Sequence, residues 1–188
     1  LRAQLEPHML FNTLANLRSL VDDDPTQAKH MIDQLITYLR SALAGSRSDT
    51  TTLRAEFAQL AAYLEIMSLR LGRRLRYQLD LPEALQQATV PAMLLQPLVE
   101  NAIKHGIEPK IGGGAIAVTA RSTNGSLELE VADTGLGLPP DHDPDHSSDS
   151  YGLVHVRDRL RALYGSHASL RLQANKPQGT LATVRIPA

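Results

Sequence analysis

An amphipathic helical pattern covers the first 46 residues and is interrupted once, by a run of three aspartates and a proline at Asp22–Pro25. Such a run ends one helix and caps the next. Two helices of this length cannot enclose a hydrophobic core, so residues 1–46 are predicted to form a hairpin that pairs with a second copy into a four-helix bundle. The apolar positions at helical spacing are Leu10, Leu14, Leu17, Val21, Ala28, Met31, Ile32, Leu35, Ile36 and Leu39.

A polar segment, Ala44–Thr52, follows no periodicity and is the predicted linker. From residue 52 to residue 188, helical and alternating patterns interleave, and most of the strands are adjacent in sequence. This order predicts an α+β sandwich with helices on one face of a sheet. Thr52 should cap the first helix, and Asn124-Gly125 should join two strands in a tight turn. The expected helices are 52–72, 94–105 and 152–165, and the expected strands are 75–82, 112–122, 126–135, 168–175 and 179–188.

Composition excludes several classes of protein. The 19 basic and 20 acidic residues nearly balance, so no overall field steers the chain to nucleic acid or acidic lipid. The chain has no cysteine, which excludes disulfides and thiolate metal sites and suits the reducing cytoplasm. It begins with Leu inside a helical pattern, so we expect a fragment whose upstream part has been removed.

Four polar residues fall within two helical turns of the stretch VENAIKHG: Glu100, Asn101, Lys104 and His105. An amide oxygen can bind Mg²⁺, which takes hard oxygen ligands, while the cationic side chains neutralise phosphate. At helical spacing Glu100 and Lys104 share one face, and Asn101 and His105 the adjacent one. Taken alone, the same four residues are better explained by a solvated helix face.

Glycines follow a carboxylate in the stretch VADTGLGL, where Asp133 ends a predicted strand and Gly135 and Gly137 come next. Glycine lets the backbone turn sharply and approach a ligand. Further on, Gly152 opens a helix whose free N–H groups suit phosphate. Gly179-Thr180 then begins the last strand. Each motif alone is weak, but their order along the chain is specific.

This order resembles the ATP-binding domain shared by sensor histidine kinases, gyrase-type topoisomerases, Hsp90-type chaperones and MutL-type repair proteins. The resemblance implies that Asn101 coordinates Mg²⁺, that Asp133 holds adenine and that Thr180 lies beneath the adenine. It also implies a lid at 139–150 that closes over the nucleotide. The residues that it assigns to the ATP pocket and lid are Gly135, Gly137, Gly152 and Leu153.

The stretch QLEPHMLFNTL at the start of the hairpin is similar to the signature of the autolysin-sensor and alginate-regulator (LytS/AlgZ-like) sensor histidine kinases. The resemblance implies that His8 accepts a phosphoryl group from ATP and passes it to an aspartate of a response regulator. A neutral imidazole can attack the γ-phosphorus. Met9 occupies the place where many kinases have an acid, so Glu100 is the preferred group to orient His8 or accept its proton.

Asn12 lies one helical turn after His8 on the same face. Its carboxamide could position water against a phosphorylated regulator, which would add a phosphatase activity. A packing role for Asn12 is an equal alternative.

The resemblance implies a homodimer, a response regulator, commonly of the LytTR type, and a membrane-spanning sensor upstream. Three positions depart from the pattern: Met9 replaces a Phe, Ser150 replaces a lid glycine and His155 replaces an Asn. Two other functions stay open. A superfamily ATPase would use hydrolysis for conformational work, and a non-catalytic member would act as a nucleotide-binding dimeric scaffold. A metal cluster in 142–146 is less favoured than a solvated acidic loop.

Overall fold

The computed structural model describes part of the chain, residues 7–45, 49–138 and 151–187. The predicted lid at 139–150, with Ser150, lies outside this part, and so does the side chain of His8. Within it, no helix combines the length and apolar character needed to cross a bilayer.

The chain begins with the predicted hairpin, made of α1 (Pro7–Asp23) and α2 (Pro25–Gly45). The break between the helices lies where the aspartate run indicated. The Asp24 carboxylate accepts a hydrogen bond from Gln27 N at 3.0 Å, and Pro25 takes the first helical position, where no N–H is needed.

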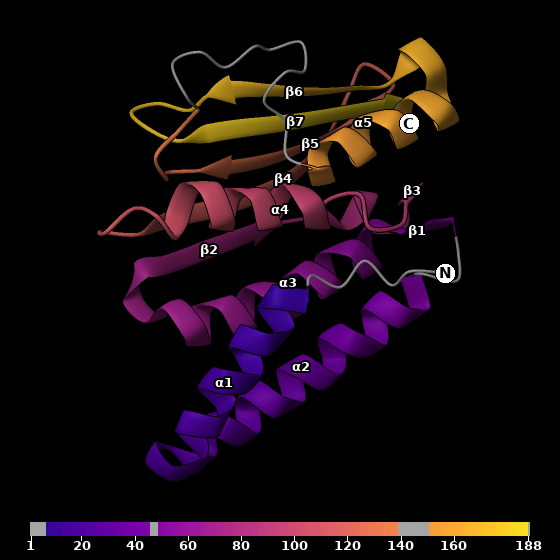
Figure 1. Cartoon of the computed structure of the whole chain (residues 1–188). Coiled ribbons are helices and arrows are strands. Elements are labelled where there is room, and N and C mark those ends of the chain that lie inside the picture. The colour runs from indigo at the N-terminus through magenta and orange to yellow at the C-terminus, as the bar shows by residue number, and fades with distance from the viewer. Residues whose placement is uncertain (1–6, 46–48, 139–150, 188) are drawn as a thin grey trace.

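The hairpin packs on α3 (Leu53–Leu71), which lies between it and the sheet (Figure 1). The expected apolar stripe is therefore only partly buried: Leu14 is 45% exposed, Val21 52%, Ile32 38% and Ile36 42%. Contact with α3 determines which side of the hairpin is covered. The periodicity of the hairpin sequence does not predict that contact. Among the hairpin side chains that the structure describes, the buried ones are Met9, Thr13, Ala28, Met31, Leu35 and Tyr38.

The predicted linker, 44–52, is wrong over its last residues. A short strand, β1 (Thr50–Thr52), pairs antiparallel with β3 (Thr89–Pro91), a strand that the sequence patterns did not indicate. Three threonines suit a strand, but a run this short shows no alternation. Thr52 also caps α3 as predicted, because its hydroxyl accepts from Ala55 N at 3.3 Å.

Five strands form the main sheet in the order β2-β4-β5-β7-β6. The β2-β4 pair is parallel and the other pairs are antiparallel, as expected for a mostly antiparallel sheet. Asn124 and Gly125 both have positive φ, 51° and 75°, which confirms the tight turn between β4 and β5. The strands are β2 (Leu75–Asp80), β4 (Gly114–Thr123), β5 (Ser126–Asp133), β6 (Ser169–Ala174) and β7 (Thr180–Pro187).

Helices cover one face of this sheet, as Figure 1 shows for α4 (Gln96–Asn101) and α5 (Tyr151–Tyr164). Alternate residues of β5 are buried, in agreement with one covered face. The predicted helix 94–105 begins at Gln96 and continues beyond α4 as a π-helix over Ala102–Ile107. One contiguous core extends from the hairpin through α3 to the sheet. The division into domains at 1–46 and 52–188 stays a prediction.

Candidate functional site

Asp133 ends β5 with its side chain buried, 3% exposed. Its carboxylate accepts a hydrogen bond from Gly135 N at 2.8 Å and another from the backbone N–H of Thr180. Burial raises the pKa of Asp133 above its ordinary value, and the Gly135 bond, the Thr180 bond and the charge of Lys110 oppose that rise. The structure therefore brings Asp133, Gly135 and Thr180 together.

Glycines let three separate segments converge on Asp133. A Cβ on Gly106 would lie 2.9 Å from Asp133 Oδ1, and one on Gly135 would lie 2.3 Å from the backbone of Gly106. A Cβ on Gly179 would lie 1.9 Å from the Asp133 carbonyl oxygen. Only glycine permits these approaches. Gly106 is absent from the predicted site residues, although it closes the VENAIKHG stretch.

Gly137 has φ 88°, a conformation that favours glycine, and a Cβ there would lie 3.2 Å from the Gly179 carbonyl oxygen. Asn175 Nδ2 donates to the Asp133 carbonyl oxygen at 2.9 Å. The loop after β5 and the loop before β7 thus form one wall beside the buried carboxylate.

Lys110 is a further residue of this wall that sequence reasoning missed. Its Nζ donates to the Thr134 carbonyl at 2.5 Å and to Gln178 Oε1 at 3.1 Å, so it joins the same two loops. A lone lysine after a helix carries no sequence signal for this role.

The predicted phosphate and metal residues lie on α4 and the π-helix. Glu100 and Asn101 are half-buried, while Lys104 and His105 are exposed. The helix widens here, with Glu108 N bonded to the Ile103 carbonyl five residues back, and the predicted sharing of faces by Glu100 with Lys104 and by Asn101 with His105 stays a prediction. π-Helices are often found at functional sites.

The start of α5 meets the start of α4. A Cβ on Gly152 would lie 3.3 Å from Pro97 Cβ, and Leu153 is buried at 2% exposure. The helix that Gly152 begins is therefore next to the helix that carries Asn101, which is consistent with its predicted place at the pocket.

Glu56 of α3 anchors the loop that leads into α4, a role that the sequence did not indicate beyond its place in the first helical turn. Its buried carboxylate accepts from Met93 N at 2.6 Å, Leu94 N at 3.1 Å and Leu95 N at 3.2 Å. Burial raises the pKa of Glu56, opposed by these three bonds and by the charge of Arg159. Met93 keeps a positive φ of 59° within this anchored loop.

His8 and Asn12 both belong to α1, which packs against α2 and α3. Asn12 is half-buried. The roles predicted for His8 and Asn12 stay predictions.

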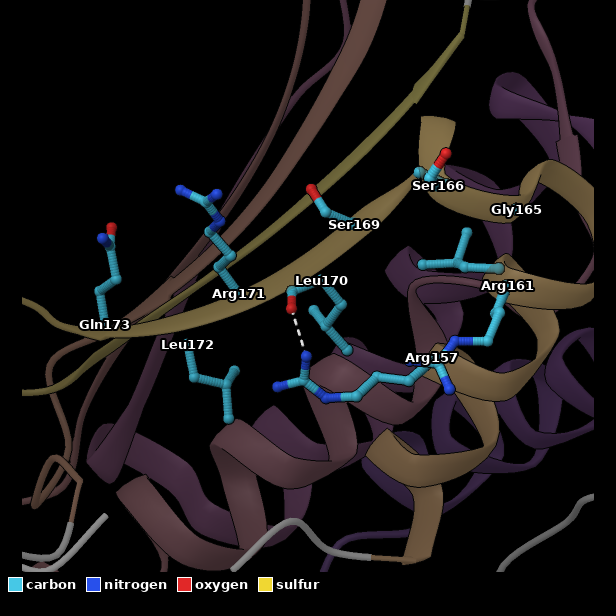
Figure 2. Close-up of a pocket in the computed structure, with 11 residues that line it drawn as sticks. Arg157, Arg161, Gly165, Ser166, Ser169, Leu170, Arg171, Leu172 and Gln173 are labelled. Atoms are coloured by element: carbon cyan, nitrogen blue, oxygen red, sulfur yellow. Dashed lines mark hydrogen bonds between the residues drawn. The ribbon is translucent and has the colours of Figure 1, made fainter. Parts of the chain in front are cut away.

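A groove of about 780 Å³ lies elsewhere, along β6 and the end of α5 (Figure 2). Arg157 reaches from α5 to donate to the Leu170 carbonyl of β6, while Arg171 and Gln173 project on the other side of the ribbon. Its lining residues lie between 157 and 173, so the predicted site residues of the described chain do not contribute to it.

Comparison with known proteins agrees with the order of these motifs. Residues 1–75 match the model of the histidine kinase family, and residues 87–188 match the family of histidine kinase-, DNA gyrase B- and HSP90-like ATPases. The sensor histidine kinase BtsS of Escherichia coli K12 is 34% identical over 187 residues, 100% of this chain and 32% of BtsS. The sensor protein LytS of Bacillus subtilis is 31% identical over 195 residues, 100% of this chain and 33% of LytS. The chain thus spans about a third of the length of these relatives.

Solved structures show the same fold at low identity. The histidine kinase domain of the blue-light-activated kinase EL346 of Erythrobacter litoralis has a TM-score of 0.59 and 17% identity, covering 96% of this chain and 95% of that one. The histidine kinase ThkA, in complex with the response regulator TrrA, has a TM-score of 0.53 and 16% identity, covering 96% and 59%. The family matches, and the similarity of BtsS and LytS over the whole of this chain, show that the chain belongs to the LytS-like sensor histidine kinases.

Proposed function

We propose that this chain is the catalytic part of an ATP-dependent protein-histidine kinase of a two-component system. It binds ATP beside Asp133, transfers the γ-phosphoryl group to His8 and then donates it to an aspartate of a response regulator. The observation that carries the proposal is the buried carboxylate of Asp133, surrounded by backbone that only glycines allow to come so close.

Adenine recognition follows from the chemistry of that carboxylate. Hydrogen bonds from the N–H groups of Gly135 and Thr180 hold the Asp133 carboxylate in one orientation. Its remaining acceptor capacity suits the exocyclic amine of adenine. Gly137 and Gly179 let the two loops of the wall approach each other closely beside the carboxylate, and Thr180 would lie beneath the base.

Asn101 fits a magnesium ion that is bound mainly through the nucleotide. The described residues contain no group of three His, Cys, Asp or Glu side chains able to hold a metal by themselves. Mg²⁺ often takes one or two protein oxygens and completes its octahedron with phosphates and water. Mg²⁺ bound there would neutralise phosphate charge, and the exposed Lys104 and His105 would add to that effect.

Glu100 is the proposed group that orients His8 or accepts its proton during transfer. A nitrogen of neutral His8 attacks the γ-phosphorus, the bond from that phosphorus to the β–γ bridging oxygen breaks, and ADP leaves. Because α1 carries His8 and the end of β5 carries Asp133, the hairpin and the nucleotide site must meet for this step, either within one chain or between two.

A homodimer is supported by the exposed apolar side of the hairpin. Phe11 is 71% exposed, and Leu14, Val21, Ile32 and Ile36 are between 38% and 52% exposed. These large apolar side chains lie on the two helices that would meet a second hairpin in a four-helix bundle.

The response regulator is the proposed acceptor because a phosphohistidine needs an aspartate to receive its group. ThkA, a protein of the same fold, is known in complex with such a regulator. We propose a regulator of the LytTR type, a phosphatase role for Asn12, and attachment to a membrane only through an upstream sensor region, with this part in the cytoplasm. Direct binding of nucleic acid is not part of the proposal.

One alternative keeps a specific observation in its favour. Ser150 stands where the lid glycine is expected, so the chain would act as a nucleotide-binding dimeric scaffold if the lid cannot close.

The test is incubation of the chain with Mg²⁺ and γ-labelled ATP, beside His8→Gln and Asn101→Ala. Acid-labile, alkali-stable label on the wild type, lost in both variants, is the expected result. His167→Gln, which changes an exposed histidine of the sheet half, is the matched control and should keep the label. ATP binding without any label on the wild type or on Ser150→Gly would support the scaffold instead.

A further inference from the structure

The buried amide of Gln96 joins the hairpin to the rest of the described chain, residues 49–138 and 151–187, which we call the nucleotide half. Gln96 is the first residue of α4 and is 2% exposed. Its Nε2 donates to Tyr38 Oη at 3.3 Å and to Glu100 Oε1 at 2.9 Å. Tyr38 belongs to α2, whereas Glu100 lies one turn further along α4. The amide NH₂ group of Gln96 therefore connects Tyr38 of the hairpin with Glu100, the proposed proton acceptor.

The partners define the orientation of this amide. An ionised carboxylate only accepts hydrogen bonds, so the NH₂ group of Gln96 must face Glu100. The hydroxyl of Tyr38 can accept from the same NH₂ group. Tyr38 itself is held firmly, because it is fully buried and its ring lies against that of Tyr63, with centroids 5.7 Å apart and planes at 44°.

The glutamine at this position has an unfavourable contact with its surroundings as well as two hydrogen bonds. Within the described chain, Gln96 Oε1 is buried and accepts no hydrogen bond. Such a buried acceptor is unfavourable, and an apolar side chain of similar size would avoid the loss. The NH₂ group of Gln96 thus has a role that outweighs its unsatisfied oxygen.

We propose that Gln96 is a positioning residue that holds the Glu100 carboxylate and couples its orientation to the place of α2 on the nucleotide half. This inference rests on the proposed function, in which Glu100 assists transfer to His8. While Tyr38 contacts Gln96, the amide has a fixed direction and Glu100 has a fixed rotamer. A displacement of α2 breaks the Tyr38 contact and frees both side chains. Movement of the hairpin is thereby transmitted to a group that acts on the phosphoryl transfer.

The experiment measures the single-turnover rate of His8 phosphorylation at saturating Mg-ATP, with ATP affinity measured separately by calorimetry. Gln96→Met keeps the volume and removes the NH₂ group. We expect its rate to fall by about 10- to 100-fold, the effect of losing one hydrogen bond to a charged group, with ATP affinity unchanged. Gln59→Met is the matched control, because Gln59 is also buried but donates to the Met93 sulfur, and it should keep the rate.

Tyr38→Phe removes only a hydroxyl and is the second test variant, to be used if Gln96→Met folds poorly. Its rate should fall by a smaller factor, about 3- to 10-fold, and it should add nothing in a Gln96→Met background because both act through one amide. In a Glu100→Gln background, Gln96→Met should likewise cause no further loss.

Two outcomes overturn the inference. If Gln96→Met keeps the wild-type rate in an active protein, or lowers it equally with and without the Glu100 carboxylate, Gln96 serves only for packing. Absence of label on the wild type is a different failure, because it rejects the proposed kinase reaction and the positioning role together.

Discussion

The Asp133 end of the sheet and the α1–α2 hairpin are built in different ways. At the sheet, backbone from three segments meets around one buried carboxylate. The hairpin buries one side on α3 and leaves Phe11, Leu14 and Ile36 in solvent. The difference is the one that our proposal requires, in which ATP binds beside Asp133 and a second hairpin covers the exposed apolar side of α1 and α2.

The strongest test of this contrast is Gly135→Ala. Its Cβ would lie 2.3 Å from the backbone of Gly106, so the loop beside Asp133 must move. We expect ATP affinity to fall by about 100-fold or more, which corresponds to about 2.8 kcal/mol of binding free energy at about 1.4 kcal/mol for each tenfold change. The oligomeric state should stay unchanged. Isothermal titration with ATP and sedimentation velocity measure the two quantities.

Gly112→Ala is the control for that change, because no atom lies within 4 Å of a Cβ placed there and its φ is not positive. It should bind ATP like the wild type. Equal affinities for Gly135→Ala and Gly112→Ala would show that the convergence of backbone is not what forms the site.

Ile36→Glu tests the other region. A charge on the exposed apolar side of the hairpin should weaken dimerisation by about 10-fold or more, because it would be buried at the bundle interface, and should leave ATP affinity unchanged. Val154→Glu on α5 is the matched control, since Val154 is 41% exposed and Ile36 is 42% exposed. If both variants sediment like the wild type, this side of the hairpin is not the dimer interface.

The pH dependence of stability sharpens the account of the nucleotide half. Burial raises the pKa of Glu56 above the ordinary 4.5, so the folded state holds this proton more tightly than the unfolded state does. The contribution of Glu56 to the free energy of unfolding therefore falls as the pH rises from 4.5 through the raised pKa of the folded state. Relative to Glu56→Gln, the wild type should lose free energy of unfolding over this window.

Urea denaturation at several pH values measures that difference between wild type and Glu56→Gln. Glu83→Gln, a change at an exposed carboxyl, gives the baseline slope. A wild-type stability that rises relative to Glu56→Gln over the same window would contradict the raised pKa.

The smallest expected effect is at the contact between the two regions. Glu65 of α3 accepts from Tyr77 Oη at 2.7 Å and lies 3.1 Å from His30 Nε2 of α2. The Tyr77 bond, followed by the His30 bond, lowers the pKa of Glu65, so this stabilisation is present above the ordinary carboxyl pKa and is lost as pH falls through the lowered value. Tyr77→Phe should cost about 1 kcal/mol and His30→Gln less, because His30 is half-exposed.

Thermal unfolding near neutral pH and at a series of lower pH values measures both costs. Each cost should shrink as the pH falls through the lowered pKa of Glu65. A larger cost for His30→Gln than for Tyr77→Phe would reverse the assigned order of the two contacts.

Sequence patterns predicted most elements of the fold because their signals are local. The aspartate run before Pro25, the Thr52 cap and the Asn124-Gly125 turn each depend on residues a few positions apart. The order of Asp133, Gly135 and Thr180 likewise indicated one pocket, and the structure brings these residues together.

Contacts between residues far apart in the chain were decided only by the tertiary structure. Gln96 meets Tyr38 across 58 positions, and Glu56 reaches the N–H groups of 93–95 across 37 to 39 positions. Periodicity shows that a helix has an apolar side, but not which other element covers it, so the packing of the hairpin on α3 was not predictable. Local hydrogen bonding and backbone sterics act over one turn and are encoded in short stretches, whereas packing is chosen by the whole chain when it folds.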